Sequence, residues 1–378
     1  MNRPCDFIVL GGGIAGASVA CFLAPHGRVV LLEREDQPGY HSTGRSAAMF
    51  MEGYGSPQAR ALTRASRRFF ESPPEGFADG PLLAPRGALT IAAADQADRL
   101  KADYATLRVH AKHLQWLDAA AARELVPVLR PQAAAQAVLD AAAMEIDVHA
   151  LHQGYLRTAR RHGCEVVCGA EAAAIGRSGS GWLVRTDRDR YATAVVVNAA
   201  GAWADRVALM AGVRTIGLMP KRRAAFTFNA PAGEAIERWP LFLPVDESFY
   251  VKPDAGQLLG SPANADPVEP HDVQAEELDI AIAIDRIQAA TTLTIRRPNR
   301  VWAGLRSFVS DGDLVGGFAT DAPGFFWVAA QGGYGVQTSA AMGEACARLI
   351  RGLAVPGHVA SEGVTEASLS PQRLEPSR

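Results

Sequence analysis

The chain has 378 residues, a formal net charge of −2 and a hydrophobic fraction of 48%. This is the composition of a globular protein with one or two sizeable cores, and it argues against disorder. Acidic and basic residues nearly balance and no block of like charges occurs, so the sequence indicates neither nucleic acid nor an anionic membrane as a partner. We expect the partner to be a small molecule.

Cysteine usage and the N-terminal pattern restrict the class further. The five cysteines are Cys5, Cys21, Cys164, Cys168 and Cys346. Their odd number and spacing indicate neither a disulfide framework nor a metal site. The N-terminus runs directly into an apolar strand-like segment, without the pattern of an export signal, and no segment approaches the roughly 20 apolar residues of a membrane span. We therefore expect no metal, no transmembrane segment and a cytoplasmic location.

The first predicted elements, in chain order, form a β-α-β unit. Residues 6–10 are a short β-rich run, residues 15–23 are apolar and rich in alanine, and residues 29–32 are a second apolar run. Further on, a helix is predicted from Asp147 to about Gly163 and a strand at 193–197. A strand at 325–330 leads through glycines into a helix at 336–350. These lengths and apolar patterns are typical of an α/β protein.

The intervening pieces, 76–145 and 216–300, are richer in proline, charged and aromatic residues and show mixed patterns. We predict an α/β protein with two domains that the chain enters more than once. The first is a Rossmann-like, doubly wound domain made of 1–75, 146–215 and 301–378. The second is a mixed, mainly antiparallel substrate domain made of 76–145 and 216–300. The polar tail after about Gly357 is expected to be peripheral.

Glycines between the first strand and the first helix match a dinucleotide-binding pattern. Gly11, Gly13 and Gly16 form G-x-G-x-x-G, which lets the backbone approach a pyrophosphate at a helix N-terminus. Glu33 lies 33 − 11 = 22 positions after the first glycine, where a carboxylate can accept ribose hydroxyls. An ordinary tight turn is the alternative for the glycines alone. NAD and FAD both bind to such a unit.

The next segment favours FAD over NAD. Residues 41–48 read His-Ser-Thr-Gly-Arg-Ser-Ala-Ala, a run of small and hydrogen-bonding residues that a plain NAD domain does not need. A bulky isoalloxazine ring with its pyrophosphate does need such a cradle. No cysteine or histidine is placed so as to suggest a covalent link, so we expect non-covalent FAD.

Several motifs occur together over nearly the whole chain: 11–18, 33–34, 41–48, 198–203, 220–223, 246–250, 258–273, 304–308 and 331–338. In this order they resemble the superfamily of D-amino-acid oxidase, glycine oxidase and sarcosine oxidase. Within it, the likeness is greatest to the bacterial D-arginine dehydrogenases. The resemblance implies a D-amino-acid oxidase-like fold, in which the Rossmann-like domain binds FAD.

The resemblance also implies a set of cofactor-binding residues. Besides the three glycines of the motif and Glu33, they are Ile14, Ala15, Arg34, Ser42, Thr43, Gly44, Arg45, Ser46, Ala47, Ala172, Ala200, Gly201, Gly304, Gly332, Gly333, Tyr334, Gly335, Val336, Gln337 and Thr338. The glycine-rich turn at 332–335 leads into a helix, whose N-terminus would direct its backbone N–H groups at the side of the flavin ring that becomes negative on reduction. Glycines that serve packing alone are the alternative there.

Two arginines are candidates for binding a substrate carboxylate. Arg223 and Arg306 match carboxylate-binding arginines of the superfamily, and a guanidinium can bind a carboxylate through two parallel hydrogen bonds. Tyr54 and Tyr250 match tyrosines that contact the substrate, and Gly333 matches a carbonyl that receives its amine. Without the resemblance, surface arginines and core tyrosines would be the ordinary interpretation.

The positions that set substrate specificity depart from the D-arginine dehydrogenases. Ala88 stands where those enzymes have a glutamate that faces the substrate guanidinium, and Met49 replaces a histidine, with Met51 nearby. An apolar pocket favours neutral or hydrophobic side chains over cations. Glu52 could restore a cation site, because residues 49–55 match a mobile lid, although a solvated loop acid is the simpler interpretation.

The sequence therefore predicts a dehydrogenase of D-amino acids. The α-hydrogen leaves as hydride to the flavin, and water hydrolyses the imino acid to a 2-oxo acid. The electron acceptor, oxygen or a quinone, is left open. Alternatives are an oxidase of secondary amines or N-methyl amino acids, a flavin-bearing electron carrier and, least favoured, an NAD-dependent dehydrogenase. The arginine pair argues against a mere carrier.

Overall fold

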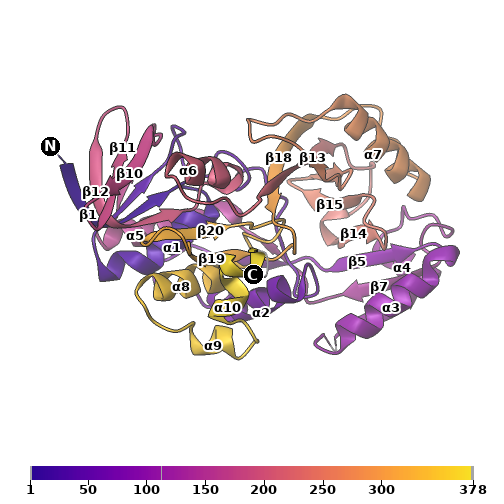
Figure 1. The fold of residues 1–378 in the computed structure, drawn as a ribbon. Helices are drawn as coiled ribbons and strands as arrows, with labels where there is room; N and C mark the ends of the chain where they lie inside the picture. Colours follow the sequence, from indigo (N-terminus) through magenta and orange to yellow (C-terminus); the bar gives the residue numbers. More distant parts are fainter. Residues whose placement is uncertain (1, 112, 376–378) are drawn as a thin grey trace.

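Two large β-sheets organise the chain and lie side by side (Figure 1). The structure, a computed structural model, describes residues 2–111 and 113–375. The strands of the first sheet are β1 (Asn2–Leu10), β2 (Val29–Leu32), β9 (Glu165–Val167), β10 (Ala174–Ser178), β11 (Gly181–Arg185), β12 (Arg190–Asn198), β19 (Val315–Phe318) and β20 (Phe325–Ala329). The helices around it are α1 (Ile14–Leu23), α2 (Pro57–Glu71), α5 (Val148–Arg161), α6 (Ala204–Met210), α8 (Ser339–Ile350), α9 (Gly357–Ala360) and α10 (Glu366–Leu369).

The centre of the first sheet is parallel, in the order β12-β1-β2-β9, and β20 runs parallel to β12. Alternate residues of its strands face two different cores. Val9 of β1 packs with α1, α5 and α8, whereas Ile8 and Leu10 pack in the core that contains residues of α6. This doubly covered parallel sheet confirms the predicted Rossmann-like domain, and the strands and helices predicted for it are present within a few residues of their expected ends.

The second sheet is mainly antiparallel, in the order β17-β13-β16-β15-β14-β5-β7-β6, and β18 pairs with β13. Its strands are β5 (Ala88–Ala92), β6 (Gln115–Asp118), β7 (Gln136–Asp140), β13 (Met219–Phe228), β14 (Leu241–Pro244), β15 (Tyr250–Asp254), β16 (Gln257–Ser261), β17 (Asp266–Pro267) and β18 (Arg300–Phe308). Its helices are α3 (Ala97–Arg108), α4 (Ala119–Leu125) and α7 (Glu277–Ala290). Phe226, Phe242 and Ile287 are fully buried between this sheet and its helices.

A third, small sheet consists of β3 (Met49–Phe50), β8 (Met144–Ile146) and β4 (Leu83–Pro85). Glu145 of β8 forms ion pairs with Arg86 and with Lys252 of β15, whose side chain is 3% exposed. Burial acts to raise the pKa of Glu145, but hydrogen bonds and charge from Lys252 and Arg86 lower it below its ordinary value. The charged cluster therefore ties β15 to the strand that pairs with β3.

Strand β18 lies in a different sheet from the one that the predicted domain division gives it. The division at residue 301 assigned this segment to the first domain, whereas it pairs with β13 from Met219 to Thr227 in the second sheet. The partner strand is more than 70 residues away in sequence, so no local pattern could reveal the pairing. The chain returns to the first sheet only after Phe308, through Leu314 and β19.

The prediction of a peripheral tail was wrong. Val359, Val364 and Leu369 are at most 2% exposed and belong to the core beneath α1 and α8. The amide of Gln58 in α2 donates to the carbonyl of Ser368 over 2.7 Å. Because so few apolar residues occur in this segment, its composition concealed that Val359, Val364 and Leu369 are buried. Within 2–111 and 113–375, no helix combines the length and apolar character required to cross a membrane.

Candidate active site

The loop between β1 and α1 has the tight geometry that its glycines predict. Gly11 has a φ of +104°, and a Cβ on it would lie 2.4 Å from the carbonyl oxygen of Ala199. Another residue would therefore be strained and would clash. The N–H of Gly12 donates to Oε2 of Glu33 over 2.7 Å. The acid predicted to bind ribose thus also fixes the glycine loop.

His152 supports the same loop from α5. The side chain is 4% exposed, and its Nε2 lies 2.8 Å from the carbonyl oxygen of Gly12. Burial lowers the pKa of His152, so the neutral ring donates its Nε2–H to this carbonyl. The ring also packs so closely on Gly39 that a Cβ there would lie 2.9 Å from Cε1. His152 therefore contacts the glycine loop and the segment before the cradle, and sequence reasoning did not single it out.

An elongated cavity follows the glycine loop between β1, β2, β12 and α6. The predicted cofactor residues that line it come from all three segments of the first domain: Gly11, Gly13, Ile14, Ala15, Glu33, Arg34, Ser42, Thr43, Ala172, Ala200, Gly201 and Gly332. Trp203 also lines it, and the guanidinium carbon of Arg34 lies 4.5 Å from the centroid of that ring. Thr43 accepts from the N–H of Ile14 over 2.9 Å, which fixes the cradle against the first turn of α1.

A second cavity adjoins the first and shares Ile14, Ser42, Thr43 and Gly332 with it. Further predicted cofactor residues that line it are Arg45, Ser46, Ala47, Gly304, Gly333, Gly335 and Val336. The two cavities together form a long space, with the glycine loop and Glu33 along one part and the glycine-rich turn at 332–335 along the other. This is the shape that an extended dinucleotide needs.

Five predicted cofactor residues do not line these two cavities. Gly16 and Gly44 shape the backbone, since a Cβ on either would lie within 2.7 Å of a carbonyl oxygen. Thr338 immediately precedes α8, and its hydroxyl donates to the carbonyl of Tyr334 over 3.0 Å. Tyr334 and Gln337 line neighbouring cavities instead. These five residues therefore shape the backbone around the cofactor cavity or line the cavities next to it.

Gln337 has a donor with no partner. Its Oε1 accepts from the N–H of Met51 over 3.1 Å, whereas its buried Nε2 has no hydrogen-bond partner among the residues that the structure describes. Leaving a buried donor unpaired costs about 1–3 kcal/mol. A bound group with an acceptor oxygen would satisfy it. Together with the glycine cradle and the carboxylate of Glu33, this donor fits FAD.

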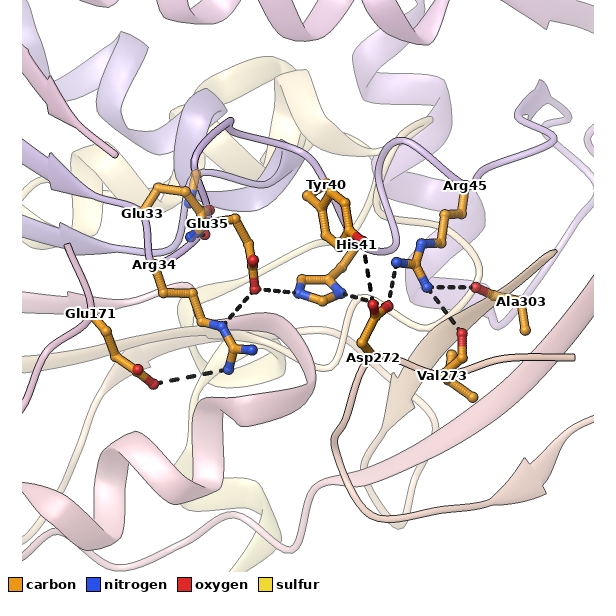
Figure 2. A network of polar contacts seen from close by, with 11 residues as sticks. Glu33, Arg34, Glu35, Tyr40, His41, Arg45, Glu171, Asp272, Val273 and Ala303 are labelled. Carbon is orange, nitrogen blue, oxygen red and sulfur yellow. Dashed lines mark hydrogen bonds and ion pairs between the residues drawn. The ribbon is translucent and has the colours of Figure 1, made fainter. Parts of the chain in front are cut away.

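A polar network lies beside the cofactor cavity (Figure 2). Glu35 accepts from Nε of Arg34 over 2.8 Å and lies 2.8 Å from Nε2 of His41. Nδ1 of His41 lies 3.9 Å from Asp272, in the connection from β17 to α7. A hydrogen bond from Arg45 lowers the pKa of Asp272, and hydrogen bonds from His41 and Arg34 offset the effect of burial and lower the pKa of Glu35. The network therefore joins the cradle to the second sheet.

Arg45, one of the predicted cofactor residues, is hydrogen-bonded to the second sheet and to the connection before α7. Its guanidinium donates to Asp272 over 2.5 Å and to the carbonyls of Val273 and Ala303 over 3.1 and 3.0 Å (Figure 2). Both Nη groups are thus hydrogen-bonded to residues outside the cradle, although Arg45 itself lines the second cavity. Arg45 ties the cradle to the connection before α7 and to β18.

The five predicted catalytic residues meet in one pocket. Tyr54, Arg223, Tyr250, Arg306 and Gly333 all line it, and the last four also line the second part of the cofactor cavity. They come from the loop after β3, from β13, β15 and β18, and from the turn before α8. The hydroxyl of Tyr54 lies 3.4 Å from Nη1 of Arg306. Residues from five distant segments therefore converge where the pocket adjoins the cofactor cavity.

The two arginines are diagonal neighbours on one face of the second sheet. Arg223 pairs with Gly304 and Lys221 pairs with Arg306 on antiparallel strands, so both guanidinium groups project on the same side. Burial and the adjacent Arg306 lower the pKa of Arg223. Among the described residues, neither arginine has a carboxylate within ion-pair distance; their hydrogen bonds go to the Asn264 carbonyl and to a tyrosine. Two partly buried cations without a counter-ion favour the binding of an anion.

The side-chain end of the pocket is mostly apolar. It is lined by Met49, Met51, Leu241, Leu243 and Phe249. Ala88 is 2% exposed and lies behind this wall, against Leu241, with one side on an outer cavity under α3. Glu52 does not line the pocket, because its carboxylate accepts from Nε of Arg67 over 2.5 Å.

Glu247 is a pocket residue that the sequence did not identify. It has a φ of +56°, an uncommon conformation for a residue with a Cβ, and it lines both the pocket and the outer cavity under α3. Its charge acts to raise the pKa of Arg223, against burial and the charge of Arg306, which lower it. Its motif, 246–250, was noted only as a resemblance. A positive φ outside glycine gives no sequence signal that could have found it.

These features define a flavin-dependent oxidoreductase, and comparison with known proteins agrees. The chain belongs to the DAO family of FAD dependent oxidoreductases, whose model matches residues 6–349. The predicted superfamily and its cofactor FAD are thereby confirmed. The cradle, the glycine loop and Glu33 are the residues that would hold it.

Individual relatives are distant. Hydrogen cyanide synthase subunit HcnC of Pseudomonas aeruginosa is 25% identical, with 95% of each chain covered. L-2-hydroxyglutarate dehydrogenase of Salmonella houtenae is 28% identical, over 55% of this chain and 50% of that one. This chain thus spans half the length of that relative.

Solved structures share the fold at low sequence identity. Glycine oxidase from Geobacillus kaustophilus has a TM-score of 0.81 at 22% identity, covering 93% of this chain and 96% of that one. An L-alpha-glycerophosphate oxidase from Mycoplasma pneumoniae, with FAD bound, has a TM-score of 0.84 at 16% identity, covering 92% and 95%. At these identities the likeness shows the fold and leaves the substrate open.

Proposed function

We propose that the protein catalyses the FAD-dependent oxidative deamination of D-amino acids with neutral or hydrophobic side chains. The observation that carries the proposal is the pair Arg223 and Arg306, which have no carboxylate partner among the described residues and line a pocket that adjoins the cofactor cavity. An α-carboxylate is a small anion that both guanidinium groups can bind at once.

The residues of the pocket would orient the substrate. The arginines bind the carboxylate, and the carbonyl of Gly333 accepts from the amine, so the α-carbon lies between two fixed contacts. FAD, when bound, accepts the hydride of the α-carbon. The substrate loses two electrons and its C–N bond becomes double; water then releases ammonium and the 2-oxo acid. An amine that binds already deprotonated requires no side chain as a base.

The apolar lining supports the preference for neutral substrates. Met49, Met51 and Leu243 offer no partner to a cation, and each buried methylene contributes about 0.8 kcal/mol. Glu247 is the one acidic side chain that lines this pocket among the described residues, and it lies at the boundary with the outer cavity, largely exposed.

The test is an anaerobic mixing experiment. The oxidised protein is mixed with D-leucine, D-methionine, D-arginine and each L-enantiomer, and the loss of oxidised-flavin absorbance is followed. We expect the neutral D-amino acids to reduce the flavin fastest. Air is then admitted, and the rate at which absorbance returns distinguishes an oxidase from a dehydrogenase. Absence of reduction by every D-amino acid contradicts the proposal.

Two other substrate classes belong in the same panel. Oxidation of N-methyl amino acids is the second candidate, because dimethylglycine dehydrogenase of Rattus norvegicus is 24% identical over 68% of this chain. A 2-hydroxy acid presents the same carboxylate and a hydroxyl that a carbonyl can also accept from. Sarcosine and L-2-hydroxyglutarate are therefore included, and faster reduction by either would replace the proposed substrate class.

A further inference from the structure

The second sheet is interrupted beside the arginine pair. Strand β16 ends at Ser261 and β17 begins at Asp266, and both pair with β13 on the same side, so residues 262–265 leave its edge opposite Ala224. Ala224 is nevertheless fully hydrogen-bonded on this side. Its carbonyl accepts from the hydroxyl of Ser261 over 2.6 Å, and its N–H donates to Oδ1 of Asn264 over 2.9 Å. Two side chains thus replace the missing strand contacts.

The same loop reaches Arg223. The carbonyl oxygen of Asn264 accepts from Nε of Arg223 over 2.6 Å. This contact occupies the inner edge of the guanidinium and leaves the two terminal nitrogens for the pocket. Ala263, the residue before, lines that pocket with a φ of +51°. An alanine in the left-handed region costs of order 1 kcal/mol, which the surrounding contacts must offset.

Asn264 is itself anchored on the far side of β13. Its Nδ2 donates to Asp266 over 2.9 Å and to Asp279 of α7 over 3.0 Å. Asp279 also lies 3.1 Å from Nε of Arg222, the neighbour of Arg223 that faces the opposite side of the strand. A chain of polar contacts therefore begins at the ion pair of Arg222 and Asp279 behind the strand. It passes through Asn264 and ends at the guanidinium of Arg223 in the pocket.

We propose that Asn264 is a positioning residue that fixes the guanidinium of Arg223 for carboxylate binding. The inference rests on the proposed function, since it assumes that the ligand of Arg223 is a carboxylate. Asn264 touches neither substrate nor cofactor in this role. Its side-chain amide holds the loop so that the backbone carbonyl of Asn264 accepts from Nε of Arg223. Without the amide, the guanidinium can rotate away from the plane in which it binds a carboxylate.

The test compares Asn264→Ala with wild type and with the control Asn299→Ala. Asn299 directly precedes β18, its Nδ2 donates to the side chains of Asn229 and Gln257, and it does not line the pocket. The probe is 4-methylpentanoate, the D-leucine skeleton without its amine, titrated into the FAD-loaded protein and followed by the change in flavin absorbance. We expect its Kd to rise about tenfold in Asn264→Ala and to stay within twofold in Asn299→Ala.

A double-mutant cycle separates positioning from general damage. In an Arg223→Lys background the side chain keeps its charge but has no Nε for Asn264 to hold, so adding Asn264→Ala should change the Kd by less than twofold. The Kd for FAD and the melting temperature are measured for every variant. An equal loss of affinity in both backgrounds, or an unchanged Kd in Asn264→Ala, overturns the inference while leaving the proposed function intact. If wild type binds neither 4-methylpentanoate nor D-leucine, the proposed function fails and the inference falls with it.

Discussion

The carboxylate of Glu52 lies 2.5 Å from Nε of Arg67, and Arg67 is also bound to Glu71 within α2. Glu52 is therefore held by a partly buried partner on the helix, away from the lining of the pocket. To bind a cationic substrate it would have to break this contact, and truncating one partner of such a pair leaves the other charge unpaired. This relationship argues against a lid that restores the cation site lost at Ala88.

The first prediction concerns the substrate side chain. Wild type should show a higher kcat/KM for D-leucine or D-methionine than for D-arginine or D-lysine. Glu52→Gln should change this ratio less than twofold, because the carboxylate does not line the pocket. Ala88→Glu should leave the ratio within twofold of wild type, because position 88 is buried behind Leu241 and does not line the pocket. If wild type favours D-arginine, the preference of Glu52→Gln and Glu247→Gln will identify the carboxylate responsible.

The second prediction concerns the arginine pair. Arg223→Ala and Arg306→Ala should each reduce kcat/KM for a D-amino acid by a factor that corresponds to about 2–5 kcal/mol, the usual cost of truncating one partner of a buried charge pair. Lys221→Ala is the matched control, since Lys221 faces the same side of β13 but packs over Phe308. FAD content should be unchanged in all three. Wild-type rates in both arginine variants would make these residues structural.

The third prediction concerns the network of Figure 2. Acid precipitation should release all of the flavin, as expected for non-covalent FAD. Asp272→Asn weakens the tie between Arg45 and the connection before α7, and we expect FAD to dissociate about three- to tenfold faster, measured by the rise of free-flavin fluorescence on dilution. Glu269→Gln, on the same connection, breaks only an exposed ion pair with Arg206 and serves as the control. Equal FAD dissociation rates for wild type, Asp272→Asn and Glu269→Gln would contradict the idea that Asp272 helps to hold the cofactor cradle.

The fourth prediction is a pH dependence that belongs to His152. Burial lowers its pKa in the folded protein by more than the hydrogen bond to the Gly12 carbonyl raises it, whereas the unfolded chain titrates near about 6.5. Between these two values the unfolded state binds more protons, so the free energy of unfolding falls as the pH is lowered below about 6.5. His152→Gln can still donate to Gly12 but does not titrate. Its stability between pH 7 and 5, measured by denaturant titration of the FAD-free protein, should fall less steeply than that of wild type.

Sequence patterns predicted the local parts of this site, and the family resemblance supplied the arginines and tyrosines from distant segments, but neither revealed how the distant strands pair. Gly11 and Glu33 are joined by one strand-helix-strand unit, so their spacing alone predicts their contact. Ala88 was identified as part of the substrate pocket, but the structure buries it behind Leu241, which lies 241 − 88 = 153 residues later in the chain. His152 and Glu247 act through a backbone carbonyl and an unusual φ, neither of which leaves a pattern in the residues around them.

Strand β18 has a consequence for the order in which the protein can fold during synthesis. Until residues 300–308 have been translated, β13 has no neighbour along one side from Met219 to Thr227, and Arg306 does not yet exist. A nascent chain at that stage therefore presents an unpaired strand edge that could pair with another chain. The strand that completes the substrate site is also the one that closes this edge, so the hazard ends when the pocket forms.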